Sequence, residues 1–124
     1  DLQALGKQYE DELMRMQTEL QTKSEDYEQN EATLPEAVKQ RRQQELQDLY
    51  QRWTQYRQTS EQEFARAQQE KMALISEKVS KAIKEVGTAG GYVYVMDITA
   101  GIPFINETLS KDVTAEVKAK LGLK

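Results

Sequence analysis

The feature that most constrains this fold is an apolar stripe of helical period that runs through residues 1 to 86 with one interruption. Residues 1 to 29 place apolar side chains at steps of three and four, and residues 34 to 86 carry a second series of the same kind. Between the two series, Thr33 and Glu36 have capping-box spacing and Pro35 suits a first helical turn. The pattern predicts two long amphipathic helices with a turn near residues 30–34, the second ending at Gly87 after roughly 80 Å.

So short a connection makes the two helices antiparallel neighbours. Folding about residue 31 or 32 pairs positions whose numbers sum to roughly 63, which places Tyr9 opposite Trp53 and Leu13 opposite Leu49. The charges agree, because residues 1 to 30 carry a net −5 and residues 31 to 86 a net +1. The apolar stripe from Phe64 to Val86 is then left without a partner in the hairpin. We expect either that an N-terminal piece has been removed or that this stripe packs against other subunits.

The pattern changes after Gly87. Residues 92–96 are β-formers that predict a buried strand, and residues 102–105 predict a second, shorter strand. Asp112 is suited to cap a terminal helix that ends at Gly122. Two strands and one short helix cannot bury themselves, so we expect self-association. The predicted interface consists of the apolar side chains of this region: Tyr92, Val93, Tyr94, Val95, Met96, Ile102, Phe104, Ile105, Val113, Val117 and Leu121.

The predicted fold class is therefore mainly α with a small β element. A helical hairpin occupies residues 1–86, and an association segment with a C-terminal helix occupies residues 87–124.

Composition excludes several kinds of chemistry. The chain has no Cys and no His, which rules out thiol nucleophiles, Cys/His zinc sites and Ser-His-Asp triads. The closely spaced glycines lead into a predicted strand, whereas a phosphate-binding loop leads into a helix. The net charge of −4, without a continuous basic stripe, disfavours nucleic-acid binding. We expect no enzyme activity, no cofactor and no metal.

Two side-chain groups on the second helix have both a functional and a structural interpretation. The aromatic residues Tyr50, Trp53 and Tyr56 suit a binding platform, but the predicted pairing favours a role in thickening the hairpin seam. The cluster Lys39, Arg41 and Arg42 suits lipid headgroups or acidic partners, but a solvated face is favoured.

Two stretches near the C-terminus, Gly91–Asp97 and Ser110–Val117, resemble the Skp, or OmpH-like, periplasmic chaperones. The second stretch resembles the Asp-aliphatic-Thr signature that opens the last helix of that family. The resemblance implies a periplasmic homotrimer whose hairpins surround a cavity that holds unfolded outer-membrane proteins without ATP. Candidate client contacts are hairpin residues not needed for the seam: Met14, Leu34 and Val38.

The sequence departs from that family in two ways. It lacks the family's initial strand and short helix, which leads us to expect N-terminal truncation, and it is acidic where well-known members are basic. The negative charge argues against peripheral membrane or lipopolysaccharide contact. The alternative function is a structural coiled-coil scaffold with one fixed, folded partner.

Overall fold

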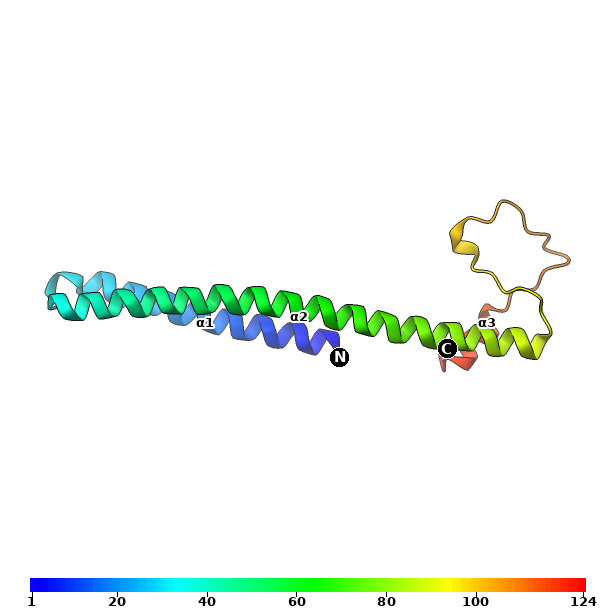
Figure 1. Ribbon diagram of the computed structural model, residues 1–124, viewed down its shortest axis with the longest axis horizontal. Coiled ribbons are helices and arrows are strands. Elements are labelled where there is room, and N and C mark those ends of the chain that lie inside the picture. Colours follow the sequence, from blue (N-terminus) through cyan, green and yellow to red (C-terminus); the bar gives the residue numbers. More distant parts are fainter. The chain divides into compact units, whose positions relative to one another are not determined.

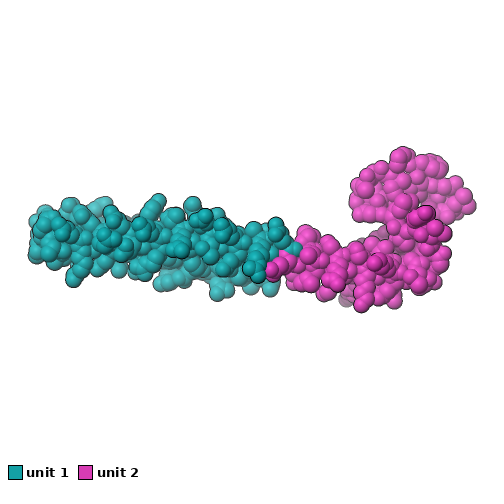
Figure 2. Space-filling model, in the orientation of Figure 1, with its two compact units in different colours: residues 1–69 teal, residues 70–124 magenta.

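The computed structural model describes residues 1–124, of which 78% are helical. In chain order the elements are α1 (Leu2–Asn30), the 3-10 turn η1 (Glu31–Thr33), α2 (Glu36–Gly90), the 3-10 turn η2 (Ile98–Ala100) and α3 (Thr114–Lys120). The chain forms two compact units, residues 1–69 and residues 70–124, which Figure 2 distinguishes by colour.

In unit 1, α1 lies alongside the first part of α2 as an antiparallel hairpin (Figure 1). The Asp1 carboxylate accepts a hydrogen bond from the Gln3 N–H at 3.0 Å and so caps α1. At the other end of α1, η1 continues the turn and Leu34 is extended. The predicted two-helix hairpin is therefore present, and α2 begins two residues later than the apolar pattern predicted.

The predicted capping box is wrong in its bonding. The Thr33 hydroxyl donates to the Asn30 carbonyl at 2.9 Å, so this side chain completes η1. The start of α2 is held instead by the Pro35 carbonyl, which accepts from Val38 and Lys39, both at 3.0 Å. The capping box failed because the turn η1 competes with the start of α2 for the Thr33 hydroxyl.

The predicted register of the hairpin is also wrong. Asp26 pairs with Arg42 rather than with position 37, and Gly6 faces Phe64 rather than position 57. The reason is the turn, because η1 and the extended Leu34 move the reversal toward residue 34. Phe64 consequently has a partner on α1.

The seam of unit 1 is narrow. Tyr27 and Leu49 are its buried apolar side chains, and Ser60 is buried with its hydroxyl donated to the Arg57 carbonyl at 3.0 Å. A Cβ on Gly6 would lie 3.3 Å from the Phe64 ring, so the missing side chain lets that ring pack closely on α1. Small side chains at Gly6 and Ser60 thus set where the two helices approach each other.

In unit 2, α2 extends to Gly90, so the predicted end at Gly87 is wrong. Gly91 has φ +66° and ends the helix, with the Tyr92 N–H bonded to the Gly87 carbonyl and the Gly91 N–H to the Thr88 carbonyl. This pair of bonds is a Schellman motif, which needs a left-handed residue and so favours glycine. Gly87 serves packing instead, because a Cβ there would lie 3.3 Å from the Val95 side chain.

The predicted strands 92–96 and 102–105 are absent from the single chain. Residues 92–97 and 102–105 form an irregular open loop (Figure 1). A strand requires a neighbouring strand to receive its backbone hydrogen bonds, and these two segments do not pair with each other. The β element of the predicted fold class is therefore not formed by one chain alone.

The predicted terminal helix is present as α3, which lies beside the last turns of α2 (Figure 1). The Asp112 carboxylate accepts from the Thr114 N–H at 2.9 Å, and Gly122, with φ +70°, ends the helix in a second Schellman motif. Lys120 pairs with Glu85 of α2 at 3.6 Å. The predicted end at Gly122 is confirmed. At the other end Val113 occupies the N-cap position without a side-chain cap bond, and Asp112 forms a turn with Thr114 one residue earlier.

The apolar stripe of α2 is covered unevenly within unit 2. Ala82 and Val86 are buried near α3, whereas Met72, Leu74 and Ile75 are exposed. The stripe from Phe64 to Val86 was predicted to lack a partner within the chain. This prediction holds in the middle of the stripe and is wrong at its two ends, Phe64 and Val86.

Candidate functional site

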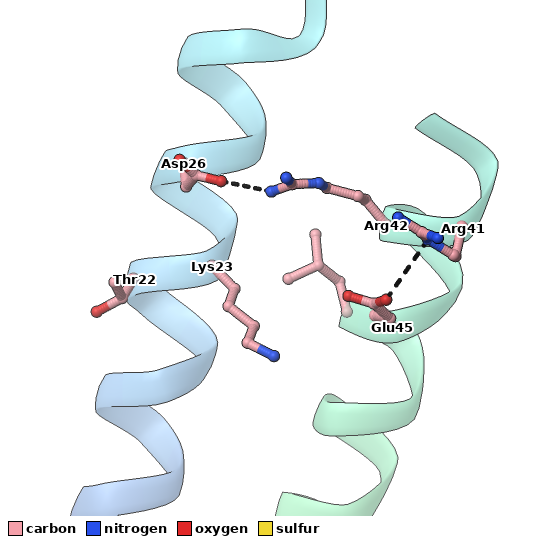
Figure 3. Close-up of a pocket in the computed structure, with 7 residues that line it drawn as sticks. Thr22, Lys23, Asp26, Arg41, Arg42 and Glu45 are labelled. Atoms are coloured by element: carbon pink, nitrogen blue, oxygen red, sulfur yellow. Dashed lines mark hydrogen bonds and ion pairs between the residues drawn. The ribbon is translucent and has the colours of Figure 1, made fainter. Parts of the chain in front are cut away.

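A polar groove of about 450 Å³ lies near the turn of the hairpin, between α1 and α2 (Figure 3). Charged side chains from both helices form most of its walls, together with Thr22 and the apolar Leu46. The charged residues are Lys23, Asp26, Arg41, Arg42 and Glu45. The Arg42 guanidinium reaches across the groove and donates to the Asp26 carboxylate at 2.5 Å. This bond joins the two helices directly.

Each cation of this groove is paired with a carboxylate. Arg41 lies 3.9 Å from Glu45 on its own helix, and Lys23 lies 3.5 Å from Glu19. A site for an anion would need cations whose charges are not already neutralised by neighbours. The pairing favours the interpretation of Arg41 and Arg42 as a solvated face that stabilises the hairpin.

The aromatic side chains of unit 1 divide between the seam and the surface. Tyr9 packs edge-on against Tyr56 with ring centroids 6.3 Å apart, and Trp53 is half-buried, so these rings line the seam as predicted. Tyr50 is exposed and lies 6.1 Å from Trp53, so it does not thicken the seam. The predicted Tyr9–Trp53 pairing is replaced by Tyr9–Tyr56, in line with the corrected register.

Two polar details accompany these rings. The Tyr9 hydroxyl donates to the Glu63 carboxylate at 2.7 Å, and this bond raises the pKa of Tyr9. The Arg57 guanidinium lies over the Trp53 ring at 5.3 Å, while the buried indole N–H of Trp53 has no hydrogen-bond partner. Arg57 thus covers the aromatic surface that the seam leaves open.

The candidate client contacts lie in different surroundings. Met14 is 68% exposed on α1, and Tyr50 is the other large apolar side chain exposed in unit 1. Leu34, in the link between η1 and α2, and Val38, in the first turn of α2, are half-buried. Met14 therefore presents the most accessible apolar surface of these three candidates.

Several candidate association residues are among the most exposed apolar side chains of unit 2. Val93, Tyr94 and Phe104 are 85%, 81% and 78% exposed, and Met96 and Ile105 are exposed as well. Tyr92, Val95 and Ile102 are half-buried. Val117 on α3 and the residues at its two ends, Val113 and Leu121, are also half-buried.

Sequence reasoning missed two exposed apolar residues of the same loop, Ile98 and Leu109. The signal that could have found them is a repeated Asx-x-Thr pattern that brackets the loop. In Asp97–Thr99, Asn106–Thr108 and Asp112–Thr114, the first side chain accepts from both the N–H and the hydroxyl of the threonine. These local turns fix where the apolar segments begin and end.

Two of those turns also set local electrostatics. The hydrogen bonds from Thr99 hold the pKa of Asp97 below its ordinary value, and those from Thr114 do the same for the pKa of Asp112. Both carboxylates therefore serve as turn acceptors. Asp97 is in addition the N-cap of η2, whereas the N-cap of α3 is Val113, so the predicted capping role of Asp112 is wrong.

The structure places no three His, Cys or acidic side chains together in an arrangement that could hold a metal ion. None of its helices combines the length and the apolar character needed to cross a membrane.

The fold thus defines a helical-hairpin protein with an apolar C-terminal segment. The family model of the OmpH-like outer membrane proteins matches residues 1–121, and the chain belongs to that family. Members of the family are periplasmic chaperones that bind unfolded outer-membrane proteins. No match was found among the curated proteins or the solved structures.

Proposed function

We propose that this protein is an ATP-independent holdase of the periplasm. It binds unfolded outer-membrane proteins in a cavity between helical hairpins, supplied by three copies of the chain, and prevents their aggregation. Residues 1–86 form the arm and residues 87–124 the association segment. Family membership supports the general role, and the particular mechanism is our proposal.

The observation that carries this proposal is the exposed apolar surface of the association segment. Val93, Tyr94 and Phe104 are β-formers on backbone that forms no strand within one chain. Apolar patches of this kind on a soluble chain are typical of an interface. Pairing of residues 92–96 and 102–105 between copies would bury these side chains and give the backbone its missing partners, which accounts for the predicted β element.

The hairpin is suited to retaining unfolded clients because its apolar contacts with them are individually weak. Its accessible apolar groups in unit 1 are few, with Met14 and Tyr50 the largest, so no single contact binds a client tightly. Several hairpins around one client raise the effective concentration of such contacts, so retention follows from their number. Nothing in this scheme consumes nucleotide.

An aggregation assay tests the proposal. A urea-unfolded outer-membrane β-barrel is diluted into buffer with and without the protein, and light scattering is followed. We expect suppression at about three chains per client, unchanged by ATP or by its enzymatic removal. Unchanged scattering, together with stable binding to one folded partner, would support the scaffold alternative, and a strict ATP requirement would refute the proposal.

A further inference from the structure

The methionines of α1 differ sharply in exposure although they are two residues apart. Met14 is 68% exposed, whereas Met16 is half-buried in the seam. A helix turns about 100° per residue, so a separation of two places these side chains on different faces. Met14 is therefore much more accessible to solvent than Met16.

The chain offers oxidants no sulfur other than that of methionine, because it contains no Cys. Two-electron oxidants such as peroxides react first with thiolates where these exist, and otherwise with accessible thioethers. Met72 and Met96 are exposed too, but both lie in unit 2, where Met96 belongs to the proposed association surface. Met14 is the exposed methionine of unit 1, outside that surface.

We infer that Met14 is a site of reversible sulfoxidation, and that its oxidation makes the hairpin release unfolded clients faster. In this step the thioether sulfur supplies an electron pair to one peroxide oxygen. The O–O bond breaks, an S=O bond forms and water leaves, so the sulfur is oxidised and the peroxide reduced. A thiol-dependent sulfoxide reductase reverses the change.

The structure explains why oxidation at Met14 leaves the fold intact. The side chain contributes little to the seam, so a sulfoxide at this position remains hydrated. The same change at Met16 would put a polar S=O group into the seam, which costs stability. Oxidation is therefore compatible with the fold at Met14 and destabilising at Met16, although both lie on α1.

The effect on holding rests on the proposed function. If clients rest on the apolar surface of Met14, a sulfoxide must lose water before each such contact forms. We expect client release to become roughly fourfold faster, the factor that corresponds to losing about one buried methylene group. Met14→Gln, which places a polar group of similar length there, should show the same faster release without oxidant.

The experiment exposes the full chain to hydrogen peroxide, removes the peroxide with catalase, and then adds an unfolded β-barrel client. Trypsin cleaves after Arg15 and so places Met14 and Met16 in different peptides, whose oxidation is followed by mass spectrometry. We expect Met14 to oxidise at least about threefold faster than Met16, with unchanged helix content and faster client release. Met14→Leu cannot be oxidised at this position, so its release rate should be the same before and after peroxide.

Equal oxidation rates for Met14 and Met16 would contradict the assignment of Met14 as the sulfoxidation site. Preferential oxidation without a change in client release, or loss of client from oxidised Met14→Leu, would overturn its effect on holding. A chain that holds no client before oxidation would refute the proposed function instead, and the peptide mapping would still decide the site.

Discussion

At the scale of single residues, the least expected finding is the role of Gly6. Glycine inside a helix costs about 1 kcal/mol relative to alanine, so its presence in α1 calls for a physical reason. The reason is the Phe64 ring, which packs where a side chain would be. The sequence alone could not reveal this contact, because it depends on a partner 58 positions away.

Replacing Gly6 tests this contact. We predict that Gly6→Leu destabilises the hairpin by about 1–3 kcal/mol, because the larger side chain displaces the ring. Thermal unfolding followed by circular dichroism measures the change. Gly6→Ala is the matched control and should stay close to the parent, since its helix propensity offsets a 3.3 Å contact. A Gly6→Leu protein as stable as the parent would show that packing of the Phe64 ring on α1 does not stabilise the hairpin.

Asp112 gives a prediction of pH dependence. Hydrogen bonds from Thr114 lower the pKa of this carboxyl in the folded chain. Its contribution to α3 is therefore present above the unfolded pKa of about 4 and is lost as the pH falls through the lower, folded pKa.

Hydrogen exchange detects this contribution. We expect Asp112→Asn to keep most of the turn with Thr114 at neutral pH and to remove its pH dependence. In Asp112→Ala, protection of the α3 amides should fall by roughly fivefold at neutral pH. If α3 in the parent chain is as protected at pH 2 as at pH 7, this turn contributes nothing to the helix.

At the scale of elements, local signals predicted the helices well. Periodicity identified α1 and α2, and Gly122 marked the end of α3, because a helix stop depends on adjacent residues. The start of α3 was predicted one residue too early, at Asp112, because the side chain of Asp112 forms a turn with Thr114 ahead of the N-cap Val113. The register failed since it depends on the conformation of the turn, which no periodic pattern contains. Gly87 was misjudged for a similar reason, because its packing partner Val95 lies beyond the helix.

The seam of the hairpin depends on a few buried side chains. Leu49 is 7% exposed, so we predict that Leu49→Ala destabilises the hairpin by about 2–4 kcal/mol, through lost burial and a residual cavity. The measurement is urea unfolding. Met14→Ala on the other helix is the exposed control and should change stability by less than about 0.5 kcal/mol. Equal effects of the two substitutions would contradict the described seam.

At the scale of the whole molecule, the candidate surfaces were partly predictable. Composition and the apolar run Tyr92–Met96 indicated an association segment, and the structure leaves Val93 and Tyr94 exposed. The predicted strands do not form within one chain, because residues 92–96 and 102–105 do not pair with each other. Ile98 and Leu109 were missed because each is a single apolar residue inside a local turn, outside any apolar run.

Charges placed on the association segment should separate the chains. We predict that Val93→Asp combined with Phe104→Asp raises the dissociation constant of the assembly by more than roughly tenfold, since each carboxylate would have to be buried. Analytical ultracentrifugation measures the change. Gln17→Asp combined with Gln51→Asp adds the same charge to exposed hairpin positions and should leave the assembly intact. Equal effects from both pairs would mean that net charge, and not this surface, controls association.

The most direct test of the central claim is native mass spectrometry of the protein before and after dilution of a urea-unfolded outer-membrane protein into it. We expect a trimer that gains the mass of one client chain. A monomer or dimer that leaves the client unbound would contradict it.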